Sequence, residues 1–177
     1  MKTQWTVDTN LRTPSPITAA FIDAYVSTRG RGGLSGIGAA VIAAQAKYGI
    51  NATYIVAHAA HETGWGTARI AREKNNLFGW RAFDASPYDS ATGFPTKGHC
   101  IDFVMGRVDA LYLNPEGRYF AGATLRGMGV RYATDPQWAE KIAKIAQGIE
   151  DAYYKSRPKP LIARVLESAG RLMGRRA

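Results

Sequence analysis

The stretch 51–66 constrains the fold more than any other part of the chain. Residues 55–60 are largely apolar and rich in alanine, with His58 as the exception, and a Thr-Gly-Trp-Gly turn follows them closely. Asparagine is a preferred N-cap, as Asn51 would be here, and glycine ends helices where the backbone must turn left-handed. The sequence therefore predicts a buried central helix over residues 53–62, against which the other elements must pack.

Helical periodicity also occurs on both sides of this segment. The predicted helices are residues 17 to about 30, 35–47, 67–74, 100–113 and 136–149, the last with Asp135 as N-cap and Pro136 at its first position. Residues 75–96 lack this period and are rich in aromatic, Gly, Pro, Ser and Asp residues, which predicts one or two short strands with a long turn. The expected class is α+β, mainly α, with a helical body and a small β-hairpin.

A chain of 177 residues, 46 % of them apolar, is long enough for one compact domain. Residues 1–16 are polar and predict an N-terminal arm, and residues 17–156 form the predicted domain. Residues 157–177 hold six basic side chains against one glutamate and predict a basic amphipathic tail. Such a tail favours anionic lipid or an acidic wall polymer; the alternative is that its apolar stripe packs on the domain.

The composition also bears on where the chain is made. Its single cysteine, Cys100, excludes an intramolecular disulfide. The first twenty residues lack the uninterrupted apolar run of a signal peptide, and no window approaches the roughly 18 apolar residues of a membrane span. We therefore expect synthesis in the cytoplasm, with export by other means if the substrate lies outside.

The sequence His58-Ala-Ala-His-Glu-Thr-Gly-Trp-Gly allows a metal site as one interpretation. Two histidines and Glu62 share a helix face, and His99 offers a further nitrogen. Their order matches neither H-E-x-x-H nor H-x-x-E-H, and no cysteine or acidic cluster completes a ligand set. We expect no metal and no cofactor, and we place His58 and His61 beside Glu62 in supporting roles at most; a zinc peptidase is the alternative.

The other interpretation makes Glu62 an acid catalyst. A carboxylate at the negative end of a helix, beside Trp65, is disfavoured by the dipole and by desolvation, so we expect its pKa to be raised. Cleavage of a glycosidic bond needs such a protonated carboxyl group at the leaving oxygen. The glycines on either side of Trp65 would let a sugar chain approach the backbone. A purely structural glutamate at the helix end is the alternative.

Three separated segments, taken together, resemble one family of enzymes. Residues 57–71, residues 75–79 (Asn-Asn-Leu-Phe-Gly) and residues 131–142 (Arg-Tyr-Ala-Thr-Asp-Pro onward) resemble, in order, the bacterial and phage cell-wall glucosaminidases of glycoside hydrolase family 73. The resemblance covers about residues 35–150. It implies a lysozyme-like fold with a helical lobe, a small β-hairpin lobe and a glycan-binding groove. It also implies hydrolysis of the β-1,4 bond between N-acetylglucosamine and N-acetylmuramic acid.

The same resemblance implies roles for individual residues. Glu62 matches the catalytic acid of the family, and Tyr132 matches a tyrosine that faces the catalytic centre. Asn76 and Phe78 match a segment that borders the cleft. Aromatic rings near these motifs are candidates for stacking on sugar faces: Trp65, Trp80, Phe83 and Tyr88.

One departure from the family concerns the second carboxylate. Many members carry another glutamate in the hairpin, whereas residues 74–115 contain none. Asp84 and Asp89 are the remaining candidates, since Asp102 starts the next predicted helix. The interpretation we favour needs no second protein carboxylate: the 2-acetamido oxygen of the substrate attacks the anomeric carbon, and Tyr132 supports that group.

The expected function is therefore metal-independent hydrolysis of peptidoglycan. The expected partner is the glycan strand, with no nucleic acid. The apparent lack of a signal peptide and the basic tail suggest a phage or prophage lysin that acts on the cell wall after release from the cytoplasm or from a virion. The alternatives are a muramidase or lytic transglycosylase, and a non-catalytic protein that binds the wall or the membrane.

Overall fold

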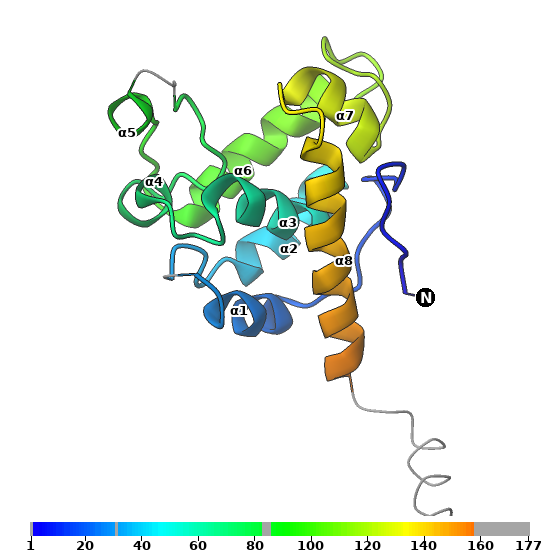
Figure 1. Cartoon of the computed structure of the whole chain (residues 1–177), viewed down its shortest axis with the longest axis horizontal. Coiled ribbons are helices and arrows are strands. Elements are labelled where there is room, and N and C mark those ends of the chain that lie inside the picture. Colours follow the sequence, from blue (N-terminus) through cyan, green and yellow to red (C-terminus); the bar gives the residue numbers. More distant parts are fainter. Residues whose placement is uncertain (1, 31, 83–85, 158–177) are drawn as a thin grey trace, which may run out of the picture.

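The central element of the structure is α3 (Ala52–Thr63), surrounded by the other helices (Figure 1). The structure is a computed structural model, and it describes residues 2–30, 32–82 and 86–157. Every residue of α3 except His61 and Glu62 is buried. The Asn51 side chain accepts a hydrogen bond from the Tyr54 N–H (3.1 Å), and Gly64 ends the helix with φ of 54°. The predicted buried helix and both of its caps are thus confirmed.

The other helices surround α3, with α4 and α5 on one side of it and α7 on the other (Figure 1). Helix α8 packs along α3, α2 contacts both α3 and α6, and α1 lies on α2. Their bounds are α1 (Ala19–Ser27), α2 (Gly38–Tyr48), α4 (Arg69–Glu73), α5 (Pro87–Ser90), α6 (Lys97–Val108), the π-helical η1 (Asp109–Leu113), α7 (Leu125–Tyr132) and α8 (Trp138–Ser156).

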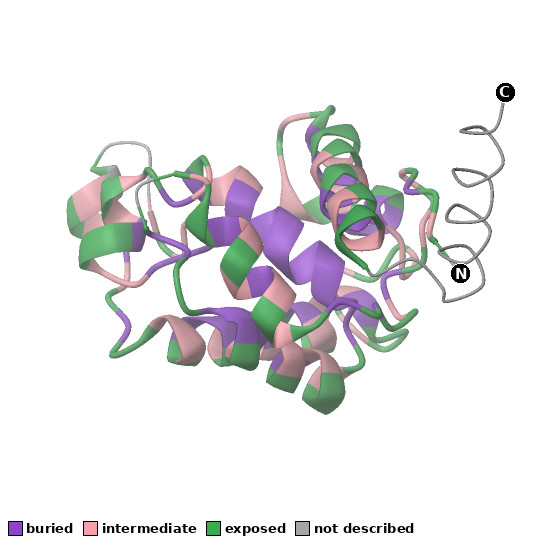
Figure 2. Cartoon of the chain, turned by 90° about the horizontal axis from the view of Figure 1, so that it is seen from below, coloured by how far each residue is buried: buried purple, intermediate pink, exposed green. Residues whose placement is uncertain are grey.

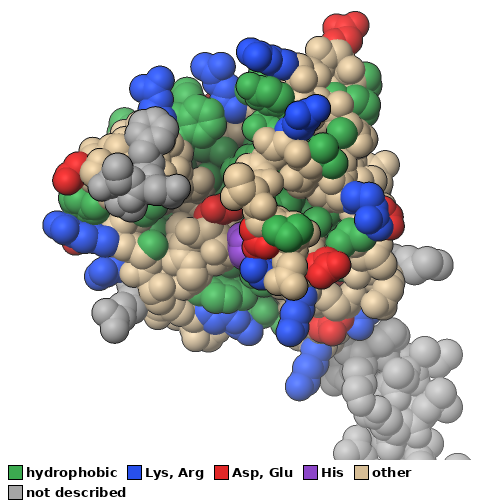
Figure 3. Space-filling model, turned by 45° about the horizontal axis from the view of Figure 1, so that its top comes forward, with side chains coloured by type: hydrophobic (Ala, Val, Ile, Leu, Met, Phe, Trp, Pro, Cys, Tyr) green, Lys and Arg blue, Asp and Glu red, His purple; other side chains and the backbone are tan. Residues whose placement is uncertain are grey.

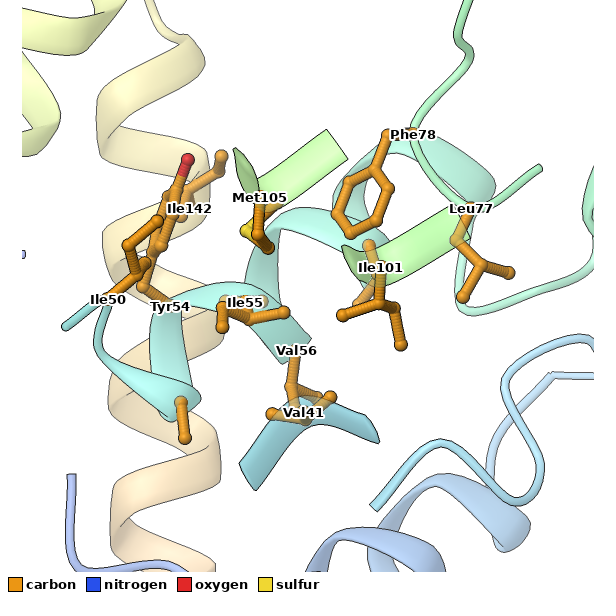
Figure 4. Close-up of a cluster of buried hydrophobic side chains, with 14 of the residues drawn as sticks. Val41, Ile50, Tyr54, Ile55, Val56, Leu77, Phe78, Ile101, Met105 and Ile142 are labelled. Atoms are coloured by element: carbon orange, nitrogen blue, oxygen red, sulfur yellow. The ribbon is translucent and has the colours of Figure 1, made fainter. Parts of the chain in front are cut away.

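The hydrophobic core lies where these helices meet, and exposed residues are found on their outer faces (Figure 2). Apolar side chains from α2, α3, α6, α8 and the loop after α4 contribute to it (Figure 4): Val41, Ile55, Val56, Leu77, Phe78, Ile101, Met105 and Ile142. Full burial of one such side chain stabilises the fold by about 1.5–3 kcal/mol. Because α3 is held along its length, the position of its C-terminal turn is fixed as well.

The N-terminal segment, expected as an arm, packs into this core. Trp5 is 5 % exposed and Leu11 is fully buried. Leu11 also bonds through its backbone, donating to the Ala123 carbonyl (2.9 Å) and accepting from the Asn51 N–H (2.8 Å). The segment therefore links the start of α3 to the loop before α7.

The expected β-hairpin is not found where the structure describes residues 75–96. In place of strands, the segment contains turns and the single turn of α5. Side chains rather than a paired strand satisfy its backbone: Asn76 bonds to Trp80 and Thr92, and Lys74 donates to the Tyr88 and Ala91 carbonyls. The prediction of a mainly helical chain is confirmed, and the prediction of paired strands is wrong for these residues.

Two features near the C-terminal helices also differ from expectation. Helix α7 was not predicted, since two glycines lower its helical signal, yet Gly127 fits close to the Gly122 carbonyl and Thr124 caps the helix. Helix α8 begins at Trp138 rather than at Pro136. Asp135 instead holds the turn before it, where its carboxylate accepts from the Gln137 N–H (2.9 Å).

Nearly all of the predicted basic tail, residues 158–177, lies outside the described residues. Within the described ranges, no helix is both long and apolar enough to cross a membrane.

Candidate active site

Glu62 lies in the last turn of α3, at the edge of the core. Its side chain is 24 % exposed, so the carboxylate reaches solvent while most of the residue is covered. Oε1 accepts a hydrogen bond from the indole Nε1–H of Trp138 on α8 (3.2 Å). His58 Nε2, one turn earlier on α3, lies 3.3 Å from the same oxygen. Two helices therefore fix the direction of this carboxylate.

A closed group of rings surrounds His58, which is fully buried. The rings of Tyr132, Phe78 and Trp138 meet the imidazole edge-to-face, with centroids 4.8, 5.1 and 5.5 Å away. Nδ1 lies 3.0 Å from the Tyr54 hydroxyl. Such packing leaves the imidazole a single orientation, with Nε2 toward Glu62.

The expected rise in the pKa of Glu62 is not found. Burial is the largest influence and acts to raise this pKa, as predicted, but the nearby His58, the indole of Trp138 and the charge of His61 together outweigh it. The pKa of Glu62 is therefore lowered in the unliganded protein. The prediction was wrong because the lowering by His58, together with that by Trp138 from α8, exceeds the effect of burial.

Tyr132 ends α7 and is half-buried beside this group. Its ring lies 5.1 Å from that of Trp138 and 5.4 Å from that of Tyr112, centroid to centroid. Burial, followed by the negative charge of Glu62, raises its pKa well above the ordinary value. The phenol therefore keeps its hydrogen at neutral pH, and it is available as a donor close to Glu62.

Gly66, in the Gly-Trp-Gly turn, packs directly against the loop before α2. A Cβ on Gly33 would lie 2.1 Å from the Gly66 carbonyl oxygen, and one on Gly66 would lie 2.7 Å from the Leu34 nitrogen. Trp65 has a φ of 61°, and its ring packs 5.9 Å from that of Tyr25. The turn is therefore a tight backbone contact that supports the end of α3.

Asn76 and Phe78, predicted to contact substrate, are both buried. The Asn76 amide donates to the Trp80 and Thr92 carbonyls (2.9 and 3.0 Å) and accepts from the Trp80 N–H (2.9 Å). Phe78 packs on His58. Both residues therefore shape the site from within, and neither presents a polar group to a ligand.

The two remaining aromatic candidates differ in their surroundings. Trp80 is half-buried with its ring 5.4 Å from that of Phe103. The Tyr88 hydroxyl donates to Glu73 (2.8 Å), and the Arg69 guanidinium lies 3.8 Å from the ring centroid. Tyr88 is thus held within a charged cluster next to α4, whereas Phe83 lies outside the described residues.

The candidates for a second carboxylate are not brought next to Glu62 by any contact among the described residues. Asp84 lies outside those residues. Asp89 is exposed on α5, and its backbone carbonyl lies 3.4 Å from Lys74 Nζ. Asp102 pairs with Lys47 (2.7 Å) and accepts from Tyr48 (2.9 Å), in keeping with the structural role expected for it.

The histidines do not form a ligand set in the described part of the chain, where no group of three or more His, Cys, Asp or Glu side chains is placed to hold a metal. His99 lies in the first turn of α6, where its backbone N–H donates to the capping Thr96 hydroxyl (3.0 Å), and its ring faces Phe94. On the face shown in Figure 3, acidic and histidine side chains adjoin near the centre, and most Lys and Arg side chains lie toward the edge.

Sequence reasoning missed two partners of this site. Trp138 lies in the predicted helix 136–149 and was not singled out, although its indole donates a hydrogen bond to Glu62. Tyr54 was not singled out, although Tyr54, His58 and Glu62 recur every four residues and so share one face of α3. The four-residue spacing is a signal that the sequence contains. The contribution of Trp138 depends on how α8 packs against α3, and the sequence contains no signal of it.

Comparison with known proteins identifies the family. Residues 38–151 match the glucosaminidase family, described as mannosyl-glycoprotein endo-β-N-acetylglucosaminidase. A protein of Streptococcus pneumoniae serotype 4, named as an endo-β-N-acetylglucosaminidase, is 41 % identical over 114 residues, 64 % of this chain and 17 % of that protein. The bifunctional autolysin of Staphylococcus aureus N315 is 29 % identical over 153 residues, 70 % of this chain and 12 % of the autolysin. The chain thus spans less than a fifth of the length of these relatives.

Solved structures show the same fold. A catalytic glutamate-to-alanine mutant of S. aureus Autolysin E, in complex with the disaccharide NAG-NAM, matches with a TM-score of 0.66 and 22 % identity over 85 % of this chain and 74 % of that one. The S. aureus Major Bifunctional Autolysin matches with a TM-score of 0.61 and 30 % identity over 85 % of this chain and 68 % of that one. The predicted mainly helical, lysozyme-like fold is thereby confirmed. Since the family match spans more than half of the sequence, the chain belongs to the glucosaminidase family of glycoside hydrolases.

Proposed function

We propose that this domain hydrolyses the β-1,4 bond between N-acetylglucosamine and N-acetylmuramic acid in peptidoglycan, with Glu62 as general acid. One observation carries the proposal: a partly exposed carboxylate, oriented by Trp138 and facing the buried His58, lies at the end of the central helix of a glycosidase domain. The complex of Autolysin E with NAG-NAM supports the choice of substrate.

In the proposed reaction, Glu62 donates a proton to the glycosidic oxygen as the bond breaks. The pKa of this group is lowered without ligand, so it must rise when substrate binds. A glycan over the exposed part of the carboxylate would exclude water and strengthen desolvation, which already acts to raise the pKa of Glu62.

As the leaving group departs, a nucleophile must attack the anomeric carbon in the same step. We assign this role to the 2-acetamido oxygen of the substrate, because residues 74–115 contain no glutamate and Asp89 is exposed on α5 beside Lys74. The Tyr132 phenol, half-buried and protonated at neutral pH, would donate a hydrogen bond to the acetamido group or support the developing positive charge. Water then opens the cyclic intermediate, and Glu62, now ionised, accepts its proton.

Mass spectrometry of digested peptidoglycan tests this assignment. We expect soluble fragments with reducing N-acetylglucosamine ends, absent when the Glu62→Gln variant is used. Reducing muramic acid ends would show a muramidase, and anhydro-muramic acid would show a transglycosylase. Release of no fragments would favour a non-catalytic binding protein. Each of these three results would overturn the proposal.

We also propose that the domain works at the cell wall, and that basic residues 157–177 strengthen its attachment to anionic lipid or wall polymer. Truncation after Ser156 should then weaken binding to whole cells, and the difference should shrink as salt is added. Equal binding of the truncated and full-length chains at low salt would contradict this role.

A further inference from the structure

His58 has one nitrogen with a partner and one without. Nδ1 lies 3.0 Å from the Tyr54 hydroxyl. Nε2 is buried and makes no hydrogen bond of acceptable geometry within the described ranges, although Glu62 Oε1 is only 3.3 Å away. Buried polar atoms normally have partners because leaving one unsatisfied is costly. An unpaired nitrogen that faces an active-site carboxylate therefore indicates a functional role.

Tyr54 determines which nitrogen of His58 carries a fixed hydrogen. Its hydroxyl lies 2.9 Å from Met128 Sδ and 3.0 Å from His58 Nδ1. A phenol has one hydrogen, and a thioether sulfur can only accept. When the Tyr54 hydrogen is donated to Met128, Nδ1 must carry a hydrogen of its own and donate it to the Tyr54 oxygen. Nε2 is then left without a fixed hydrogen.

We propose that His58 is a positioning residue that shares one proton with Glu62 through Nε2. In one form the proton is on Nε2 and faces ionised Glu62. In the other it is on Glu62 Oε1 and is donated to the Nε2 lone pair. The transfer breaks one N–H bond and forms one O–H bond, so the proton count and the net charge of the pair stay the same. This inference rests on the proposed role of Glu62 as general acid.

The arrangement would supply the proton when it is needed. While the carboxylate is open to water, the charged pair is favoured, in agreement with the lowered pKa of Glu62. A bound glycan removes that water, and separated charges become costly in a less polar site. The neutral pair, with the proton on Glu62, is then favoured. The proton leaves with the glycosidic oxygen, and the water that completes hydrolysis returns one.

The surroundings of His58 restrict its proton exchange to Glu62. Helix α3 contributes Tyr54 and Glu62, α7 contributes Tyr132, and the uncharged rings Trp138 and Phe78 close the remaining sides. Burial raises the pKa values of Tyr54 and Tyr132 well above the ordinary value, so both phenols keep their protons. His61 affects Glu62 only through its charge.

Two matched substitutions separate proton sharing from simpler roles. His58→Gln places an uncharged N–H near the position of Nε2, facing Glu62, whereas His58→Asn places one near Nδ1, facing Tyr54. Neither can carry a shared proton. A carboxyl group ordinarily loses its proton about two pH units below an imidazole. The basic limb of the pH–kcat profile should therefore move to lower pH by about one to two units in both variants, with activity largely restored at acidic pH.

If the basic limb of the pH–kcat profile of His58→Gln stays at its wild-type position, the proposal is overturned, because a hydrogen bond to Glu62 would then be enough to explain the role of His58. A uniform loss of activity at every pH in both folded variants would also overturn it, because that is the mark of a structural role. Inactivity of Glu62→Gln tests the proposed function separately; a fully active Glu62→Gln variant would remove the premise.

Nuclear magnetic resonance on the wild-type protein provides a test that does not need either variant to fold. With ¹⁵N-labelled histidine and ¹³C-labelled glutamate, we expect His58 Nδ1 to stay protonated across the titration. Nε2 and the Glu62 carboxyl carbon should titrate together, as coupled sites do. An unprotonated Nδ1, or a Glu62 signal that titrates alone, would overturn the proposal.

Discussion

The two sides of the candidate site are built in different ways. The helical side, formed by α3, α7 and α8, holds its functional groups by burial and ring packing around His58. The loop side, residues 75–96, is held by hydrogen bonds from Lys74 and Asn76 to the backbone. In the proposed function, the helical side carries the chemistry and the loop side shapes the space in front of it.

The largest effect is expected from Glu62→Gln, on the helical side. An amide cannot donate the proton that the leaving oxygen needs, so kcat should fall about 10²- to 10⁴-fold. The measurement is release of soluble fragments from purified peptidoglycan. Glu116→Gln, at an exposed position, is the matched control and should keep wild-type turnover. Equal losses in the two variants would break the assignment of chemistry to α3.

On the loop side, Asn76→Asp should cause the largest loss of stability. A carboxylate at this buried position would face the Trp80 and Thr92 carbonyl oxygens that now accept from the amide. We expect the free energy of unfolding to fall by about 3 kcal/mol, measured by chemical denaturation. Asn75→Asp, half-buried and bonded to the Phe94 carbonyl, is the control and should lose about 1 kcal/mol. An Asn76→Asp variant that is as stable as the wild type but has no turnover would contradict the structural role assigned to the loop side.

Gly33→Ala tests how the end of α3 is supported. The added Cβ would lie 2.1 Å from the Gly66 carbonyl oxygen, and backbone would have to move. We expect a loss of about 2–3 kcal/mol in the free energy of unfolding. Gly93→Ala, where a Cβ meets nothing within 4 Å, should change it by less than about 0.5 kcal/mol. Similar values for both would show that the loop before α2 does not support the turn after α3.

A smaller effect is expected in the pH dependence of stability. Because the pKa of Glu62 is lowered from 4.5, its ionised form stabilises the fold above that pH, and this stabilisation is lost as pH falls through the lower value. The Tm of the wild type relative to that of Glu62→Gln should therefore decrease as the pH is lowered from about 6 to about 3. A constant difference over this range would mean that His58 and Trp138 do not favour the carboxylate.

More of the helical side than of the loop side could be predicted from the sequence. The apolar run before Glu62, with Asn51 and Gly64 as caps, defined α3, because a helix is a local structure with a short period. The family motifs then singled out Glu62 and Tyr132. The direction of the Glu62 pKa depends first on His58, one turn earlier on α3, and then on Trp138, whose contact comes from the packing of α8 and has no signal in the sequence.

The loop side could not be predicted for a different physical reason. Its backbone is satisfied by the Asn76 and Lys74 side chains, and such bonds have no sequence period. The aromatic and glycine content therefore suggested a hairpin where the described residues form turns and α5. Helix α7 was missed because its two glycines lower the helical signal of the segment, and the close fit of Gly127 to the Gly122 carbonyl could not be predicted from the sequence.

Turnover of an Asp84→Asn/Asp89→Asn double variant tests most directly whether the chemistry belongs to the helical side alone. If the 2-acetamido group of the substrate is the nucleophile, the double variant should cleave peptidoglycan at a rate of the same order as the wild type, while Glu62→Gln is inactive. A loss of turnover as large as that of Glu62→Gln, in a folded double variant, would place a catalytic carboxylate on the loop side and contradict the account.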